Sequence, residues 1–313
     1  MSSAREAPRY TGVRTFAGLR HVPLAQARAA GARAAVVGVP FDTATSWRAG
    51  ARFGPEAIRA ASVVLRAWHP THHLEVLGEG AAIDAGDVAI TPGNAARSAE
   101  QVAAALAPLC EAGVTPVVLG GDHSVALGEL RAQAMAHGPV ALIVLDAHAD
   151  TWEDYYGERL FHGTVLRRAA EEGLLEPEHS LIAGVRGSLY ASEDLEQARA
   201  LGFALEPIEE LRASAPPAFA ARVRERVGAA PAVVGVDIDV VDPSAAPGTG
   251  TPEVGGLSSG ELLALLRALA GVRVIGADVV EVCPPYDSPG QITALLAANV
   301  AYEMLALAAL AGR

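Results

Sequence analysis

The sequence is poor in several features that mark whole classes of protein. Only two of its 313 residues are cysteines, Cys110 and Cys283, too few for a disulfide framework. Lysine and arginine number 24 against 36 acidic residues, and the chain has no basic stripe of the kind that binds nucleic acid. Aromatic residues make up 5%, whereas Ala, Val and Leu dominate. This composition suits buried parallel strands covered by helices.

Membrane and secretion signals are also lacking. No apolar stretch reaches the roughly 18 uninterrupted residues of a membrane span. The longest, 292–310, contains Asn299, Tyr302 and Glu303. The first ten residues, MSSAREAPRY, include no apolar segment of the signal-peptide type. We therefore expect a cytoplasmic protein with two buried, reduced thiols and with neither a membrane nor a nucleic acid as partner.

Short apolar runs alternate with helix-length amphipathic segments along the chain, and no linker or repeat separates them. This alternation predicts one α/β domain over residues 1–313, with a mostly parallel central sheet between two helical layers, a three-layer α/β/α arrangement. The predicted strands are 34–39, 115–119, 140–145, 180–185, 231–238 and 272–280. The predicted helices are 55–61, 96–111, 125–136, 164–172, 192–201, 218–227, 258–269 and 291–311.

Polar residues follow four of these predicted strands directly. In a parallel α/β sheet, ligands bind beyond the carboxyl ends of the strands, so these residues are expected to meet at one edge. Side chains two apart in an extended segment project to the same side, which also favours convergence. The residues are His123, Asp146, His148, Asp150, Asp237, Asp239 and Glu281.

These residue types indicate a metal site. Buried carboxylates without compensating charge cost several kcal/mol each, and a cation removes most of that cost. Carboxylates mixed with two imidazoles and no thiolate favour Mn²⁺ over Zn²⁺. The carboxylates outnumber what one divalent ion needs, so two ions about 3.5–4 Å apart fit better. Any single pair alone is also explained by a turn or a helix cap.

Several motifs, in their order and spacing, resemble the ureohydrolase superfamily of arginases and agmatinases. They are GGDHS (120–124), DAHAD (146–150), FHGT (161–164), GVRGSLY (184–190), DIDVVDP (237–243) and DVVEV (278–282). Two more, VVGVPFD (36–42) and ARFGPEAIR (51–59), resemble its agmatinase branch. The resemblance runs from about Tyr10 to the C-terminus. It implies an arginase-like fold, two Mn²⁺ per subunit and a homo-oligomer, either a trimer or a hexamer.

The resemblance also implies a role for each site residue. His123, Asp146, Asp150 and Asp237 match the ligands of one Mn²⁺, and Asp146, His148, Asp237 and Asp239 match those of the other. Glu281 matches the carboxylate that pairs with a substrate guanidinium. Asp150 would accept a proton from the attacking water, and His162 would relay one to the leaving amine.

The substrate tail is the open question. Thr151 directly follows Asp150, so no arginase-like asparagine is placed to grip an α-amino acid head, and this points away from arginine. The resemblance therefore implies a linear guanidino substrate, first agmatine, which gives putrescine for polyamine biosynthesis and urea. The alternative is 4-guanidinobutyrate or a related guanidino acid. The tail loop, 152–160, carries Glu153, Asp154 and Glu158 against Arg159, a local acidic excess that suits a cationic tail. Arg167 and Arg168 lie on the helix that follows, and Arg186 would suit an anionic tail.

Two other readings are weaker. A Zn²⁺-dependent deacetylase of the same architecture would lack an equivalent of His123, and a non-catalytic regulatory homologue would have lost ligands. His69, His72 and His73 have a loose metal-like spacing, but we expect a surface turn there. For Cys283, two residues beyond Glu281, packing is the expected role.

Overall fold

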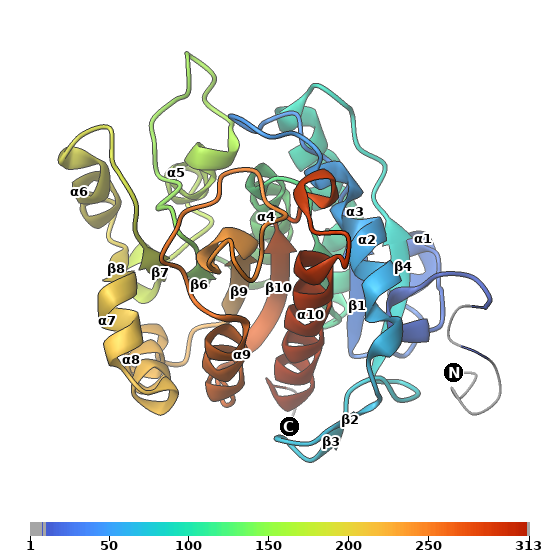
Figure 1. The fold of residues 1–313 in the computed structure, drawn as a ribbon. Helices are drawn as coiled ribbons and strands as arrows, with labels where there is room; N and C mark the ends of the chain where they lie inside the picture. Colours follow the sequence, from blue (N-terminus) through green and yellow to red (C-terminus); the bar gives the residue numbers. More distant parts are fainter. Residues whose placement is uncertain (1–7, 9–10, 312–313) are drawn as a thin grey trace.

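The structure, a computed structural model, describes residue 8 and residues 11–311 of the chain. Eight strands form one sheet in the order β4-β1-β5-β10-β9-β6-β7-β8, and every neighbouring pair is parallel (Figure 1). The strands are β1 Ala34–Gly38, β4 Ala82–Asp87, β5 Thr115–Leu119, β6 Ala141–Leu145, β7 Leu181–Val185, β8 Ala204–Pro207, β9 Ala232–Asp237 and β10 Val274–Val280.

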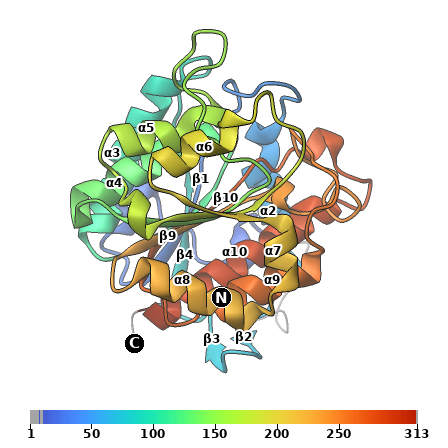
Figure 2. The same ribbon diagram turned by 90° about the vertical axis from the view of Figure 1, so that its left-hand side faces the viewer.

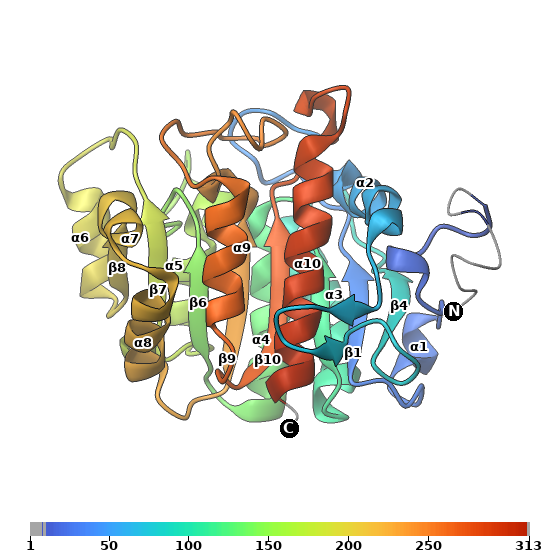
Figure 3. The ribbon, with the colours of Figure 1, turned by 60° about the horizontal axis from the view of Figure 1, so that its bottom comes forward.

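Helices cover both faces of this sheet. Figures 2 and 3 show α3 to α6 on one face, and α2 and α7 to α10 on the other. Successive residues in a strand point to opposite faces, so Val117 of β5 packs with α9 and α10, whereas Val118 packs with α3. The predicted three-layer arrangement is confirmed. The helices are α1 Leu24–Ala27, α2 Gly54–Ala61, α3 Ala95–Glu111, α4 Ala126–His137, α5 Val165–Glu171, α6 Glu193–Ala200, α7 Ile208–Ala213, α8 Pro216–Val227, α9 Ser259–Ala268 and α10 Ile292–Ala311.

All six predicted strands and all eight predicted helices are present, within two residues of the expected bounds. The two edge strands of the sheet, β4 and β8, escape prediction because their sequences, AIDAGD and ALEP, carry acidic, glycine and proline residues. Such residues are tolerated where one side of a strand has no neighbour. Helices α1 and α7 are too short to show a helical period. We predict no signal peptide in the first ten residues. Apart from Pro8, these residues lie outside the part of the chain that the structure describes.

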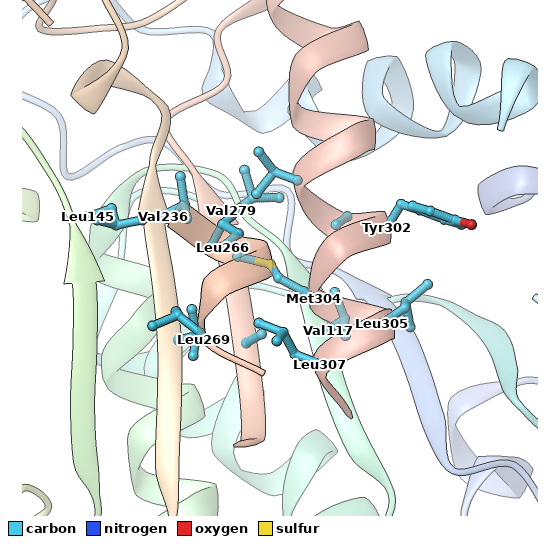
Figure 4. Close-up of a cluster of buried hydrophobic side chains, with 14 of the residues drawn as sticks. Val117, Leu145, Val236, Leu266, Leu269, Val279, Tyr302, Met304, Leu305 and Leu307 are labelled. Atoms are coloured by element: carbon cyan, nitrogen blue, oxygen red, sulfur yellow. The ribbon is translucent and has the colours of Figure 1, made fainter. Parts of the chain in front are cut away.

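Helix α10 is long and apolar enough to cross a membrane by length and composition. However, 78% of its most apolar window is buried inside the protein. Figure 4 shows Met304 and Leu307 of α10 gathered with Leu266 of α9 and with Val279 of the sheet. The helix is therefore explained by the core that it fills.

The expectation of a surface turn at His69 is wrong, because that side chain is buried. It lies on β2 (Trp68–His69), which pairs with β3 (Leu74–Glu75) in a hairpin across α10. Its Nε2 lies 2.8 Å from Oε2 of Glu303, and its Nδ1 accepts a hydrogen bond from the backbone N–H of His72. Arg267 donates to the other oxygen of Glu303 at 2.8 Å. This network fastens the hairpin to α9 and α10.

A second buried polar cluster, between α4 and β10, has too few hydrogen-bond donors. Both carboxylate oxygens of Glu129, Oε1 of Gln133 and Oδ1 of Asp278 are buried without a hydrogen-bond partner. The side-chain amide of Gln133 donates away from them, to the carbonyl of Ile275 at 3.1 Å. Burial, and then the charge of Asp278, raises the pKa of Glu129 well above its usual value. The folded protein thus holds a proton on Glu129 that the unfolded chain releases more easily.

We expect Glu129→Gln to stabilise the protein at pH 8. The new amide can donate to the neighbouring oxygens, and an unsatisfied buried group costs about 1–3 kcal/mol. Because the folded-state pKa is raised, the wild type loses stability as pH rises above the usual carboxyl pKa. The gain in unfolding temperature, measured by calorimetry, should therefore be larger at pH 8 than at pH 5.

Glu100→Gln, an exposed substitution on α3, removes the same formal charge and serves as the control. A Glu129→Gln protein that is less stable than the wild type at pH 8, or whose gain does not grow with pH, would show that Glu129 is not the proton-holding group.

Candidate metal centre

Four neighbouring strands at the middle of the sheet, β5, β10, β9 and β6, end at the same edge and deliver the predicted ligands there. Each is a run of buried apolar residues followed at once by polar ones. Short turns fix the geometry after the strands. Oδ1 of Asp122 accepts from the backbone N–H of Ser124, and Oδ1 of Asp237 accepts from that of Asp239. Convergence therefore comes from turns rather than from the extended alternation that the sequence suggests.

The predicted ligands form two groups that share Asp146. In the first group, Nδ1 of His123 lies 2.8 Å from Oδ2 of Asp150, 3.3 Å from Oδ2 of Asp146 and 3.7 Å from Oδ2 of Asp237. Each of the two groups that follow has three donor atoms close enough to hold one ion: His123, Asp146 and Asp150, and then Asp146, His148 and Asp239.

The second group lies beside the first and is more open. Nδ1 of His148 is 3.0 Å from Oδ2 of Asp239 and 3.7 Å from Oδ1 of Asp146. The side chain of His148 is 32% exposed, whereas Asp146 and Asp239 are fully buried. The opening on the His148 side is where a substrate can approach.

These donors fit divalent metal ions. Nδ1 of His123 and Oδ2 of Asp146 are buried, and although they lie close to other donor atoms of the cluster, neither has a partner in hydrogen-bond geometry, a costly state that coordination relieves. The donors are carboxylate oxygens and imidazole nitrogens, with no thiolate among them, and this set suits Mn²⁺.

The buried carboxylates of the cluster repel one another, so added positive charge would stabilise them. Burial, followed by the charges of Asp239 and Asp146, raises the pKa of Asp237 well above its usual value. Burial and the charge of Asp146 likewise raise the pKa of Asp150. Burial lowers the pKa of His123, but interactions with Asp146 and Asp150 outweigh it and raise that pKa. Protons and metal ions therefore compete for these side chains.

Two residues of the site have left-handed backbone conformations that non-glycine residues seldom adopt. The φ angle is 49° at Asp150 and 60° at Glu281. Each such conformation costs on the order of 1–3 kcal/mol and persists where the surroundings impose it. At Glu281, the backbone N–H donates to the carbonyl of Gly121 at 2.9 Å, which holds the strained residue against the end of β5.

Glu281 and His162 meet beside the ligand cluster. Oε1 of Glu281 lies 3.0 Å from Nδ1 of His162 and accepts from the backbone N–H of His123 at 2.9 Å. Its Oε2 is buried and has no partner. On the other side of the imidazole, Ser46 contacts Nε2. Ser46 is absent from the predicted site, although it belongs to the ATSW segment next to the agmatinase-like motifs.

A pocket of about 380 Å³ opens over the cluster. At its inner end lie His148, Asp150 and His162, and its outer walls are built from aromatic and acidic side chains. Those walls include Trp47, Trp152, Tyr190, Asp194 and Glu253. Asp194 and Glu253 are further residues that the sequence motifs do not single out, because Asp194 lies in the first turn of α6 and Glu253 in a loop, both outside those motifs.

Arg186 does not serve the pocket as a cation for an anionic tail. Its guanidinium donates to the backbone carbonyls of Asp239 at 2.6 Å and Glu253 at 2.7 Å, and also to those of Gly184, Val240, Val241 and Val254. A guanidinium has five N–H donors, so little capacity remains for a ligand. Arg186 instead holds the segment that carries Asp239 in place.

The arginines near the tail loop are engaged elsewhere too. Arg159 pairs with Glu171 at 2.9 Å. Arg167 donates to the carbonyl of Thr151 and to the side chain of Gln197, both at 2.7 Å. In contrast, the carboxylate of Glu253 forms no hydrogen bond or ion pair with any residue in the described part of the chain. The free charge on the pocket walls is therefore acidic.

Cys283 packs rather than reacts. It is fully buried, and its Sγ lies 3.5 Å from the carbonyl of Ala49. Burial, together with the charge of Glu281, raises the pKa of its thiol to about 12. Cys110 is buried and unpaired as well, so the expectation of two reduced, buried thiols is confirmed.

An α/β/α fold with paired carboxylate–imidazole groups at the strand ends is the arrangement expected of a hydrolase of the ureohydrolase class. The chain belongs to the arginase family, whose model matches residues 32–306. It is 41% identical to the guanidinobutyrase of Pseudomonas aeruginosa, over 96% of this chain and 93% of the relative. It is also 41% identical to the mitochondrial agmatinase of Gallus gallus, over 90% of this chain and 82% of the relative.

A solved structure gives the same result. The proclavaminate amidino hydrolase of Streptomyces clavuligerus matches 97% of this chain and 100% of its own, with a TM-score of 0.91 and 40% identity. The arginase-like fold is thus confirmed. Together with the family, these relatives identify the protein as a hydrolase that acts on guanidino C–N bonds of small molecules.

Proposed function

We propose that the protein is a Mn²⁺-dependent agmatinase that hydrolyses agmatine to putrescine and urea. The observation that carries this proposal is the combination of the two ligand groups with a pocket whose free charges are acidic. A cytoplasmic location, a single domain over residues 1–313 and a trimer or hexamer belong to the same proposal.

The proposed ligands are divided as the family resemblance implies. His123, Asp146, Asp150 and Asp237 would hold one Mn²⁺, and Asp146, His148, Asp237 and Asp239 the other. The distances around His123 support the first set, including Asp237, whose Oδ2 lies 3.7 Å from Nδ1 of His123. When bound, the two ions lower the pKa of a water molecule so that it attacks at neutral pH.

The chain's own side chains orient the substrate and move its protons. The unpartnered Oε2 of Glu281 is placed to accept a hydrogen bond from the guanidinium, a charge-assisted contact that aims the carbon at the ligand cluster. Asp150, with its raised pKa, accepts the proton of the attacking water. For His162, burial lowers the pKa, but the hydrogen bond and the charge of Glu281 raise it overall, which suits a group that later gives up a proton.

The tail of agmatine ends in an ammonium group, and the outer pocket suits a cation. Glu253 supplies a carboxylate that is free of other partners, and Trp152 and Tyr190 pack edge to face nearby, with ring centroids 5.4 Å apart. Aromatic faces attract cations, by about 0.5–2 kcal/mol depending on exposure. Gly187, with φ of 85°, leaves the space beside the Glu253 carboxylate that any Cβ would fill.

A second candidate substrate is 4-guanidinobutyrate, which ends in a carboxylate. The likeness to a guanidinobutyrase favours it. Against it stands the engagement of Arg186, Arg167 and Arg159 in other contacts.

The test is kcat/KM for agmatine and for 4-guanidinobutyrate at the same Mn²⁺ loading, in the wild type and in Glu253→Gln. We expect the wild type to prefer agmatine. Loss of the Glu253 charge should lower kcat/KM for agmatine by roughly tenfold, since a half-buried ion pair is worth on the order of 1–2 kcal/mol. The value for 4-guanidinobutyrate should stay the same or rise.

Glu153→Gln, an exposed change in the tail loop, is the control and should leave the ratio of the two values alone. A wild type that prefers 4-guanidinobutyrate would overturn the assignment of agmatine but leave the guanidino hydrolase intact.

A further inference from the structure

Ser46 makes two contacts with the side chain of His162, one through its backbone and one through its hydroxyl. Its backbone N–H donates to Nε2 of His162 at 3.1 Å, and its Oγ lies 2.9 Å from the same nitrogen. On the opposite side of the ring, Nδ1 lies 3.0 Å from Oε1 of Glu281. His162 is only 6% exposed, so these contacts fix how it carries its protons.

The partners determine the tautomer. An ionised carboxylate only accepts hydrogen bonds, so Nδ1 carries the proton toward Glu281. A backbone N–H only donates, so Nε2 of the neutral ring presents its lone pair to Ser46; when Nε2 gains a proton, it gives up the backbone N–H and keeps the hydroxyl as its partner. Both ring nitrogens are therefore occupied. Of the contacts on Nε2, only the Ser46 hydroxyl can reverse its direction: it donates to a neutral ring and accepts from a protonated one.

Ser46 also lines the pocket over the ligand cluster, together with Trp47, Asp150 and His162, and it is half-buried. Two backbone contacts hold its loop in position. The N–H of Ala44 donates to Oδ2 of Asp122 at 2.9 Å, and the N–H of His162 donates to the carbonyl of Ala44 at 2.9 Å. Ser46 thus contacts the ring and lines the pocket, and its segment is held in place by the hydrogen bonds of Ala44.

We infer that the hydroxyl of Ser46 passes a proton from Nε2 of His162 to the leaving amine of the substrate. The Nε2–H bond breaks as the proton moves to Oγ, while the Oγ–H bond breaks as its proton forms an N–H bond on the amine nitrogen. One proton is transferred, the hydroxyl is restored, and His162 becomes neutral. This inference rests on the role proposed above for His162.

The charged groups that act on the ring are Glu281, Asp150 and Asp122, and of these Glu281 alone is bonded to it in the described structure. Each of them favours a proton on His162 before transfer. Unlike these carboxylates, the Ser46 hydroxyl is neutral and can both accept and donate a hydrogen bond. Its neighbour Thr45 offers a matched comparison, because its buried Oγ1 has no hydrogen-bond partner.

The test compares Ser46→Ala, Ser46→Thr and Thr45→Val in Mn²⁺-loaded enzyme. Proton transfer by a positioned group contributes on the order of 10²–10⁴-fold, and the ring and the backbone N–H remain in Ser46→Ala. We therefore expect kcat to fall by about 10- to 100-fold with KM within threefold, Ser46→Thr to recover most of the loss, and Thr45→Val to match the wild type.

A second substrate isolates the proton step. An agmatine analogue fluorinated on the second carbon from the leaving nitrogen releases a less basic amine, which needs protonation less. The loss in Ser46→Ala should therefore shrink with this analogue. Equal losses with both substrates, or a Ser46→Ala enzyme as fast as Thr45→Val, would overturn the inference.

Metal content and unfolding temperature are measured for each variant, and Ser46→Gly replaces Ser46→Ala if the latter does not fold. Urea release by the wild type tests the proposed function separately. A wild type that releases urea while Ser46→Ala keeps full kcat refutes the Ser46 relay alone.

Discussion

Asp146→Asn is expected to lower kcat/KM by at least about 10³-fold, equal to roughly 4 kcal/mol of activation free energy. Asp146 belongs to both three-donor groups, with one carboxylate oxygen toward His123 and the other toward His148. An amide offers one poor ligand atom where a carboxylate offers two, so the variant should also bind less metal. Urea release and elemental analysis of the purified protein measure the two effects together.

Asp154→Asn is the matched control. Asp154 lies exposed in the tail loop, and its Oδ1, which accepts from the backbone of Gly157, is retained in asparagine. It should keep both activity and metal. An Asp146→Asn enzyme with full metal content and normal turnover would contradict the assignment of Asp146 as a shared ligand.

Glu281→Gln is the second large effect, and it should spare the metal. Its Oε2 is buried and unpartnered, so it is the atom available to a guanidinium. Truncating one member of a buried charge pair costs roughly 2–5 kcal/mol, which is on the order of 10²–10³-fold in kcat/KM. Because Glu281 is a proposed substrate contact and not a proposed ligand, elemental analysis should give the wild-type metal content.

Steady-state kinetics with agmatine measure this loss, and exposed Glu153→Gln again provides the baseline. If Glu281→Gln loses metal in proportion to its activity, then Glu281 supports the ligand cluster and does not hold the substrate. A Glu281→Gln enzyme with activity within a factor of three of the wild type would contradict both roles, substrate contact and support of the ligand cluster.

The ligand cluster could be predicted from the sequence because every member lies at the end of a buried strand or within a few residues after it. In a parallel sheet, the order of strands decides which ends are neighbours, and the apolar runs before Asp146 and Asp237 locate those ends unambiguously. The middle of the sheet is predictable for the same reason. The edge strands of the sheet are harder to predict, because β4 and β8 need not be apolar on both faces.

Contacts between distant loops could not be predicted in this way. Ser46 and His162 are 116 residues apart and meet because the irregular segment that carries Ser46 lies against the short 3-10 helix that begins at His162. The sequence suggests that Arg186 is a free cation, and only its six carbonyl partners show that it is a structural residue. His69 likewise looks like a turn residue until the hairpin places it against Glu303, 234 residues away.

The central claim is that the clustered carboxylates and imidazoles hydrolyse a linear guanidino compound with the help of bound Mn²⁺. The most direct measurement is the amount of urea and of amine formed from agmatine by purified protein of known Mn²⁺ content. The account predicts urea and putrescine in equal amounts, at a rate that falls when Mn²⁺ is removed and returns when it is restored. Fully Mn²⁺-loaded protein that forms no urea from agmatine or from 4-guanidinobutyrate would contradict it.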